Sequence, residues 1–545
     1  MNEPIKVALV AHNARFTHTN PAIRSMLVTA NDRLAVEINE GRLVFVASEV
    51  TINDPLDARA ARLDALKADI YLFSAYIWNV AEIREVAEIL KKANPARLVG
   101  CGGPEVSYTP EEELCKTPWF DFILCGEGEL QIVELGQALL AHNIWPALEH
   151  LPAITQTVRG MVCRTTNFSN DLGFLYGPQN GCVNLDAIPF LWDRSLGGEI
   201  NQDKNLSNRM LYYESSRGCP FHCIYCLSSV ETGLRLRDLS TVFSELKELV
   251  ERDAMLVKFV DRSFNASPQR AKAIWAYLIE SYKPGQRTRF HFEIEADLMD
   301  PESLALLSQA PPHLFQFEIG VQTTNPAVLR TIKRQQDNDH VAEVVNAIRT
   351  RCNIHLHLDL IAGLPGEDMD SLRRSFNDVY KLKPDVIQLG FLKILKGTPM
   401  ETVARERGFA WRNSPPYEVI ASDAMDYNDI LSLKCIETVL DRFYNQPWLA
   451  EVLEPIVASY AEPFSFYEEM AQHAVLHNLL YRRVAAEEWY AELLRFGQKR
   501  AASGRCEIDS PRAWFLFFQT KYQAQQRRGR LSWDGFVTRY RIQEP

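Results

Sequence analysis

Three cysteines spaced as CxxxCxxC constrain this chain more than any other feature. Cys219, Cys223 and Cys226 lie in a short loop, opened by Gly218 and Pro220, directly after a predicted strand. Thiolates are the natural ligands of iron–sulfur clusters. A cube of four irons takes four ligands and this loop supplies three, so one iron stays open to a substrate. Zinc sites pair CxxC units or combine cysteines with histidines, and the motif therefore predicts a [4Fe-4S] cluster ahead of structural zinc.

The segment that carries this loop alternates strands with helices. Between residues 211 and 397, six predicted strands are each followed by a helical stretch, which predicts an open (β/α)6 barrel with working residues at the carboxyl ends of its strands. Residues 1–142 show the same alternation and predict a doubly wound, Rossmann-like α/β domain. Residues 143–210 are rich in Pro, Asn and Gly and predict a connecting segment. Residues 398–545 predict a mainly helical domain.

Composition narrows the classes of protein that this chain can be. At 46% hydrophobic and 24% charged residues, its 545 residues are typical of soluble globular proteins. A net charge of -11 argues against a general nucleic-acid binder. No apolar run approaches the roughly 18 residues of a membrane span, and no signal peptide precedes the first strand, so we expect a cytoplasmic protein without a membrane partner. The eight other cysteines are expected to be isolated buried side chains.

The cysteine loop resembles the radical S-adenosylmethionine (radical SAM) superfamily. The motif, the aromatic Tyr225 before the third cysteine and the barrel pattern all agree with that family. The resemblance implies that the open iron binds the amino and carboxylate groups of SAM. One electron, from a donor such as flavodoxin or ferredoxin, would then break a carbon–sulfur bond to give methionine and a 5′-deoxyadenosyl radical.

Later strand ends match the same family in the same order. The matching segments are 259–265, 293–295, 318–322, 359–367 and 395–399. Glu293 and Glu295 are two residues apart on a predicted strand and are expected to point the same way. The resemblance implies that one of them, with Glu318 and Gln322, reaches the ribose or amino group of SAM. It also implies that Gly363 lets the backbone pass close to the adenine.

The first domain resembles the cobalamin-binding domain that is fused to many radical SAM enzymes. Glycine-rich strand ends let a bulky ligand approach backbone N–H groups, whereas the first strand lacks the GxGxxG turn of a dinucleotide site. An ordinary Rossmann-like domain or a degenerate relic stays open as the alternative. The residues that the resemblance assigns to cobalamin are His18, Thr19, Asn20, Ser74, Tyr76, Trp78, Asn79, Gly102, Gly103, Pro104, Glu105, Val106, Gly126, Glu127, Gly128 and Glu129.

One motif of cobalamin domains is absent. The DxHxxG sequence, whose histidine ligates cobalt in many of them, does not occur, and the spacing of His12 and His18 does not match it. The resemblance therefore implies cobalamin without a protein histidine on cobalt.

A closer resemblance, at residues 18–24, 74–79, 415–419 and 442–445, is to one subfamily with a C-terminal domain of unknown function. It implies cobalamin-dependent methylation of an unactivated carbon: one SAM methylates cob(I)alamin, a second yields the radical, and the substrate radical takes the methyl group from methylcobalamin. Two alternatives stay open, an enzyme with the same cofactors that rearranges, cyclises or oxidises its substrate, and a cofactor-sensing protein. The substrate can be a small molecule, a peptide or a protein side chain.

Overall fold

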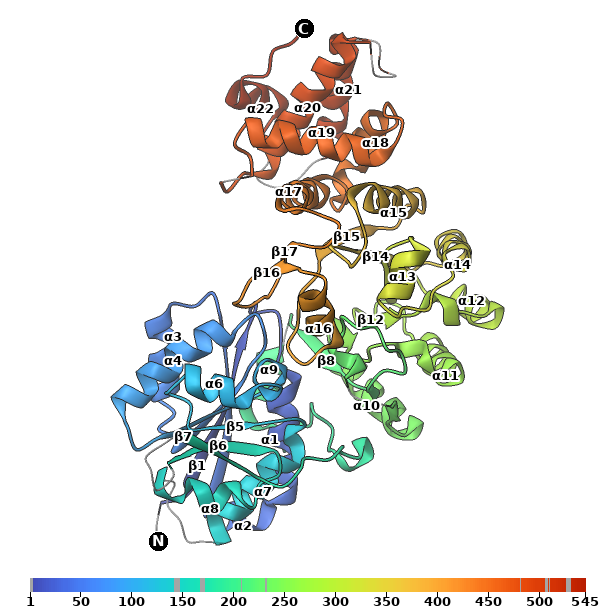
Figure 1. Ribbon diagram of the computed structural model, residues 1–545. Coiled ribbons are helices and arrows are strands. Elements are labelled where there is room, and N and C mark those ends of the chain that lie inside the picture. Colours follow the sequence, from blue (N-terminus) through green and yellow to red (C-terminus); the bar gives the residue numbers. More distant parts are fainter. Residues whose placement is uncertain are drawn as a thin grey trace.

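The computed structural model describes the chain except residues 1–2, 142–147, 167–171, 207, 231–232, 481, 505–507, 509 and 526–530. The expected domain boundary at 142–143 and Cys506 lie outside the described residues. No helix in the described ranges is long and apolar enough to cross a bilayer. Figure 1 shows an N-terminal α/β domain beside a second α/β region, with a group of helices at the far end of the molecule.

The N-terminal domain is built on a seven-stranded sheet of order β2-β1-β3-β4-β5-β6-β7. Five strands are parallel: β1 (Ile5–Asn13), β2 (Leu43–Thr51), β3 (Ile70–Ser74), β4 (Leu98–Gly102) and β5 (Phe122–Leu124). The last two, β6 (Met161–Thr166) and β7 (Leu172–Tyr176), add antiparallel at one edge. The strand order reverses beside β1, which makes a crevice beyond the carboxyl ends of β1 and β3, where sheets of this kind bind ligands.

Helices cover both faces of this sheet because its strands are apolar on both sides. Val7 and Leu9 of β1 pack beneath α1 (Pro21–Arg33) and α7 (Gly128–Ala141), whereas Ala8 and Val10 face α3 (Leu56–Asp64) and α4 (Val80–Ala93). The expectation of a doubly wound Rossmann-like domain is confirmed.

The second region is a six-stranded parallel sheet of order β15-β14-β13-β12-β11-β8, whose two edge strands do not pair with each other. Its strands are β8 (Met210–Tyr213), β11 (Leu256–Phe259), β12 (Arg289–Ile294), β13 (Phe315–Gln322), β14 (His355–Ala362) and β15 (Val386–Phe391). Its main helices are α10 (Leu239–Glu251), α11 (Pro268–Glu280), α12 (Pro301–Leu307), α13 (Pro326–Thr331), α14 (Asn338–Arg351), α15 (Met369–Lys381) and α16 (Pro399–Glu406). This is the predicted open (β/α)6 barrel.

Side chains on the barrel strands alternate between the helices and the interior. In β14, Leu356, Leu358 and Leu360 are buried, whereas His357 and Asp359 between them are half-buried. The period of two places the apolar set against the surrounding helices and the polar set in the barrel interior. The interior of this barrel is therefore lined by polar side chains.

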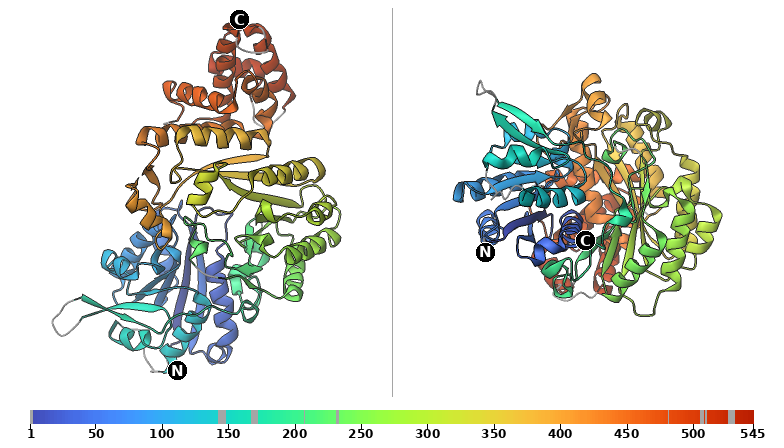
Figure 2. Two further views of the ribbon diagram at one scale, coloured as in Figure 1. Left: turned by 45° about the vertical axis from the view of Figure 1, so that its right-hand side comes forward. Right: turned by 90° about the horizontal axis from the view of Figure 1, so that it is seen from below.

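The C-terminal region is mainly helical, as predicted. It contains a short hairpin of β16 (Ala410–Trp411) and β17 (Val419–Ala421), followed by α17 (Tyr427–Phe443), α18 (Ala450–Val457), α19 (Pro463–Leu476), α20 (Ala486–Ala502), α21 (Pro511–Ala524) and α22 (Trp533–Tyr540). Its aromatic residues are mostly core: Phe443, Phe464, Phe466 and Tyr467 are fully buried. Both views of Figure 2 agree with Figure 1 in placing the N-terminal domain against the barrel.

The segment before α1 joins the N-terminal domain to the barrel. His18 forms a parallel bridge with Met210 at the start of β8, and the Thr19 hydroxyl donates to the Met210 carbonyl at 2.8 Å. Asn20 caps α1 by accepting from the Ile23 N–H at 3.1 Å, with Pro21 in the first helical turn. These contacts fix the crevice of the first sheet against the first strand of the barrel.

Candidate active site

The cysteine loop leaves the barrel at the carboxyl end of β8. Gly218 has φ +93° and a Cβ there would meet the Gly233 carbonyl oxygen at 2.1 Å, so only glycine fits this turn. Cys219 and Cys223 are 9% and 7% exposed. Backbone hydrogen bonds hold the loop on two sides, from the Ile224 N–H to the Ile332 carbonyl and from the Met400 N–H to the Ile224 carbonyl.

The arrangement of the three sulfur atoms fits a cluster better than a single ion. Around one zinc ion with Zn–S bonds of about 2.3 Å, thiolates lie at most about 4.6 Å apart. Within the described residues, the three cysteines do not form a set whose ligand atoms all lie within 4.8 Å of one another. A cube in which each cysteine holds a different iron needs sulfur atoms that lie farther apart. The residues present therefore fit a [4Fe-4S] cluster.

Glu295 lies close to the cysteine loop. Arg334 donates to Glu295 Oε2 at 2.8 Å and to the Gly320 carbonyl at 2.5 Å, and its Nη1 lies 4.0 Å from Cys223 Sγ. Burial raises the pKa of the Cys223 thiol, and the Arg334 guanidinium opposes that shift. Gln322 has φ +66°, and its side-chain oxygen is buried without a hydrogen-bond partner. A buried acceptor without a partner among the described residues fits a bound donor such as an amino group or a ribose hydroxyl.

Glu293 and Glu318 have different surroundings from Glu295. Lys258 Nζ lies 3.6 Å from Glu293 and 3.3 Å from Glu318, and His291 Nε2 is 2.9 Å from Glu318. Burial opposes ionisation of Glu318, but hydrogen bonds from His291 and Lys258 hold its pKa below its usual value. Burial and the charges of Glu318 and Glu293 raise the pKa of Asp359. These groups form a charged cluster inside the barrel.

Gly363 follows β14 with φ +84°. A Cβ at this position would meet Val419 Cγ1 at 2.7 Å, so the left-handed backbone and the packing of β17 both require glycine. Packing against Val419 therefore explains the glycine at position 363 without any contact to the adenine of SAM.

A cavity of about 520 Å³ lies between the strand ends of the N-terminal domain and the barrel. It reaches Ser216, Arg217 and Gly218 at the start of the cysteine loop. The residues predicted for cobalamin that line it are Tyr76, Trp78, Gly103, Pro104, Glu105, Gly126, Glu127, Gly128 and Glu129. The barrel region also contributes to the lining of the cavity, with residues that include Tyr212, Glu214, Arg262, Leu395 and Lys396. The cavity thus extends from the predicted cobalamin residues to the residues that flank the cysteine loop, whereas the three cysteines themselves do not line it.

Two aromatic side chains of this cavity are stacked. The rings of Tyr76 and Trp78 lie 4.3 Å apart at 8° to each other, and Trp78 is 48% exposed. A tryptophan that served only to pack the core would be buried. Gly103 and Gly126 have φ +111° and +90°, and a Cβ would meet the Ala75 carbonyl oxygen at 2.4 Å or the Asn180 amide at 2.6 Å. The positive φ and the close protein contacts require glycine at both positions, whereas the exposed, stacked rings suit a flat ligand such as the corrin of cobalamin.

The other residues predicted for cobalamin do not line the cavity. His18, Thr19 and Asn20 make the bridge, hydrogen bond and cap described above, and the buried Asn79 amide donates to the Ser74 carbonyl and the His12 carbonyl. Gly102 ends β4, and Val106 is buried in the core. For this set of residues, the visible contacts are structural.

His12 and His18, the two histidines considered as ligands of cobalt, do not line the cavity. His12 is fully buried, and burial together with Arg59 lowers its pKa to about 3. His18 Nδ1 lies 3.1 Å from the Tyr212 hydroxyl. No histidine in the described part of the chain lines the cavity, which fits cobalamin without a protein imidazole on cobalt.

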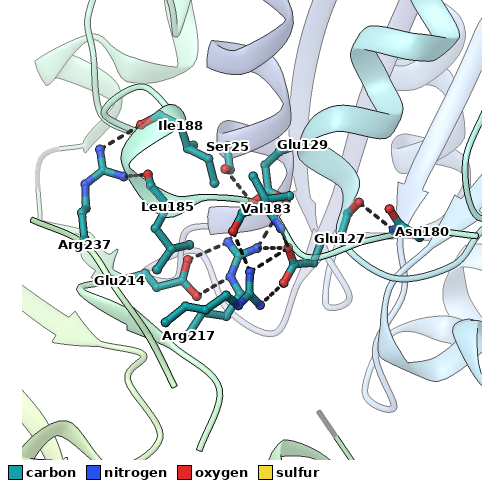
Figure 3. A network of polar contacts seen from close by, with 11 residues as sticks. Ser25, Glu127, Glu129, Asn180, Val183, Leu185, Ile188, Glu214, Arg217 and Arg237 are labelled. Carbon is teal, nitrogen blue, oxygen red and sulfur yellow. Dashed lines mark hydrogen bonds and ion pairs between the residues drawn. The ribbon is translucent and has the colours of Figure 1, made fainter. Parts of the chain in front are cut away.

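Arg217, two residues before the first cysteine, ties the cysteine loop to the glycine-rich strand ends of the first domain (Figure 3). Its guanidinium lies 2.7 Å from Glu214, 2.8 Å from Glu129 and 3.3 Å from Glu127. Arg235 forms a further ion pair with Glu127. The two carboxylates of the first domain are thus held by two arginines of the barrel, across the wall of the cavity.

Profiles of three protein families match successive parts of the chain. A profile described as B12 binding domain matches residues 42–136, and one described as Radical SAM superfamily matches residues 213–379. The chain therefore contains a cobalamin-binding domain followed by a radical SAM domain. These matches confirm the predicted cofactors, a [4Fe-4S] cluster, SAM and cobalamin. A third profile, described as a protein of unknown function (DUF4080), matches residues 405–515 of this radical SAM protein.

Several curated proteins are similar to this radical SAM protein. The 2-(S-pantetheinyl)-carbapenam-3-carboxylate methyltransferase of Streptantibioticus cattleyicolor is 24% identical over 64% of the chain and 50% of that protein. The cobalamin-dependent radical SAM methyltransferase TokK of Streptomyces tokunonensis is 23% identical, with the same coverage. The chain thus spans about half the length of these two relatives.

Solved structures share the fold. The cobalamin-dependent radical SAM enzyme OxsB superposes with a TM-score of 0.62 at 14% identity, over 99% of this chain and 83% of that one. The methyltransferase TsrM of Kitasatospora setae gives a TM-score of 0.57 at 17% identity, over 76% and 78% of the two chains. The order of domains in this radical SAM protein is therefore that of known cobalamin-dependent radical SAM enzymes.

The sequence analysis did not identify Arg217, Arg235, Arg262 or Lys396, which border the cavity or its wall. Arg217 stands in the conspicuous Arg-Gly-Cys sequence that opens the cysteine loop, so its position was a usable signal. Arg262 and Lys396 lie in the matching segments 259–265 and 395–399, but the resemblance assigns no role to either side chain. Arg235 has no local signal in the sequence.

Proposed function

We propose that this chain is a cobalamin-dependent radical SAM methyltransferase that adds a methyl group to an unactivated carbon. The observation that carries the proposal is the single cavity bordered by the cysteine loop and by the glycine-rich strand ends of the cobalamin-binding domain. When bound, SAM at the cluster supplies the radical and cobalamin supplies the methyl group. Methylation is favoured over rearrangement, cyclisation or sensing because the relatives reported above are named as methyltransferases.

In this proposal Cys219, Cys223 and Cys226 hold the cluster, and SAM lies over it. Gln322 offers an unpartnered buried oxygen to SAM, and Glu295 lies nearby in its ion pair with Arg334. The other proposed SAM residues are Tyr225, Glu293, Glu318 and Gly363. Because Glu293 and Glu318 already face Lys258, we expect their effect on SAM to be weaker than that of Gln322.

The proposed cobalamin residues are those predicted from the sequence, from His18 to Glu129. Those that line the cavity are proposed to contact the cofactor. The remaining ones are proposed to hold the cavity-lining residues in position: His18, Thr19, Asn20, Ser74, Asn79, Gly102 and Val106. Arg262 and Lys396 add positive charge to the same cavity; the Lys396 ammonium has no hydrogen bond and lies 3.8 Å from Glu105. We further propose a cytoplasmic location and a small electron donor such as flavodoxin or ferredoxin.

Cobalamin retention tests this assignment. Protein mixed with hydroxocobalamin and passed through gel filtration is expected to keep about one equivalent, because the cavity is lined by both domains. The electron paramagnetic resonance spectrum of the bound cob(II)alamin is expected to show no nitrogen splitting from a protein imidazole. Splitting that disappears in His18→Ala or His12→Ala would contradict the histidine-free site while keeping the domain assignment.

A further inference from the structure

Two histidines and a glutamate converge in the C-terminal helical region, far from the cavity. His473 lies in the last turn of α19, and His477, four residues later, is the residue that caps this helix, so the two imidazoles lie on the same side of its end. Glu492 projects from α20. One ligand atom from each of the three lies within 4.8 Å of the other two, and no other set of three His, Cys, Asp or Glu residues among those described does so.

The Glu492 carboxylate is fixed in place. Its side chain is 8% exposed; Oε2 lies 3.1 Å from His473 Nε2, and Oε1 accepts an ion-paired hydrogen bond from Arg495. A carboxylate held through one oxygen presents the other to the two imidazoles. Ligands in metal sites are commonly oriented by such outer hydrogen bonds.

A hydrogen bond between His473 and Glu492 does not by itself account for His477. The two imidazoles lie 4.2 Å apart, centroid to centroid, and the His477 ring makes no hydrogen bond within the described protein. Two rings and one carboxylate around a common point form the ligand set that zinc takes when three protein groups bind it and water fills the fourth position. His477 is exposed, so that position is open to solvent.

We propose that His473, His477 and Glu492 bind a divalent transition-metal ion, with Zn²⁺ as the fitting species. Imidazole and carboxylate ligands without sulfur suit this class of ion. Hydrolytic zinc sites on a helix carry HExxH, with the glutamate as general base. Here Ala474 stands in that place and is buried, so the site lacks the general base of an HExxH peptidase.

The metal ion would join two layers of the C-terminal region. α19 packs mainly on α17 and α15, whereas α20 packs mainly on α21 and α22. A metal ion bound by His473 and His477, at the end of α19, and by Glu492 of α20 would connect these two layers. The proposal is independent of the proposed methyltransferase function, because no residue of the cavity takes part.

Zinc content of the full-length, cluster-loaded protein tests the site. After anaerobic incubation with ZnSO4 and gel filtration, the wild type is expected to retain about one zinc per chain more than His477→Ala, with equal iron in both. His477 is exposed, so its removal leaves the helix packing intact. His340→Ala is the matched control, because His340 lies 3.8 Å from Glu343 without a third ligand and is expected to retain wild-type zinc.

A second variant separates metal binding from helix packing. Glu492→Gln keeps the size of the side chain and a hydrogen bond to His473, yet is expected to weaken zinc binding at least about tenfold, as even outer-shell changes do. Zinc is also expected to raise the melting temperature of the wild type and not of either variant. Equal zinc retention in the wild type, His477→Ala and Glu492→Gln would overturn the proposal.

Discussion

Replacing Cys223 with alanine is expected to abolish the cluster and, with it, all formation of 5′-deoxyadenosine. In the proposed site, one loop supplies three protein ligands to the cube, and loss of one would leave two irons without a thiolate. Anaerobically reconstituted wild type should contain about four irons and four sulfides with the absorbance shoulder of a [4Fe-4S] cluster. The variant should contain almost none, and chromatography of the SAM cleavage products should show no 5′-deoxyadenosine. Cys219→Ala and Cys226→Ala are expected to behave alike.

Cys435→Ala is the matched control for this experiment. Cys435 is a half-buried free cysteine of α17, away from the loop, and its loss should leave iron content and SAM cleavage unchanged. The same holds for the other cysteines outside the loop. A triple variant of Cys219, Cys223 and Cys226 that still cleaves SAM would show that the cluster lies elsewhere.

Replacing Arg217 with methionine is expected to open the wall between the cobalamin-binding domain and the cysteine loop. The side chains of Arg217, Glu129 and Glu127 are 18%, 7% and 11% exposed, so removal of the cation leaves buried carboxylates with fewer partners. Breaking a buried pair from one side costs about 3–5 kcal/mol. Amide hydrogen exchange in residues 125–131 should become faster in the variant, because the lost ion pairs lower the free energy of local opening there.

Arg194→Met gives the contrasting case. Arg194 pairs with Asp203, and both side chains are about half exposed, so this change should cost less than about 1 kcal/mol and leave exchange in residues 125–131 unchanged. If Arg217→Met exchanges as slowly as the wild type there, the network in Figure 3 does not hold the domains together.

The strands and the cysteine loop could be predicted because their signals are local. Runs of apolar residues with period two or 3.6 mark the elements of both sheets, and Gly218, Gly103 and Gly126 mark turns with positive φ. The antiparallel strands β6 and β7, by contrast, fall in the predicted connecting segment. Their place in the first sheet depends on pairing with β5, a contact between residues far apart in the sequence.

Partners across the site could not be predicted for the same reason. Glu293 and Glu295 are two residues apart, and strand periodicity predicts one common direction for them. β12 ends at Ile294, and so Glu295 pairs with Arg334 while Glu293 faces Lys258. Lys258 and Arg334 could not be predicted as these partners, because neither lies on the same strand as the two glutamates. The same limit applies to Lys396 and Glu105, which meet across two domains.

The most direct test of the proposed function follows the methyl group of SAM. Protein loaded with cluster and cobalamin is reduced and given SAM labelled with ¹³C in its methyl group, and the bound cobalamin is extracted for mass spectrometry. The proposed function predicts about one labelled methyl group per chain on cobalamin, together with 5′-deoxyadenosine, because the cavity lined by the proposed cobalamin residues reaches the residues that flank the cysteine loop. Formation of 5′-deoxyadenosine by protein that retains no cobalamin, or whose cobalamin never acquires the label, would contradict it.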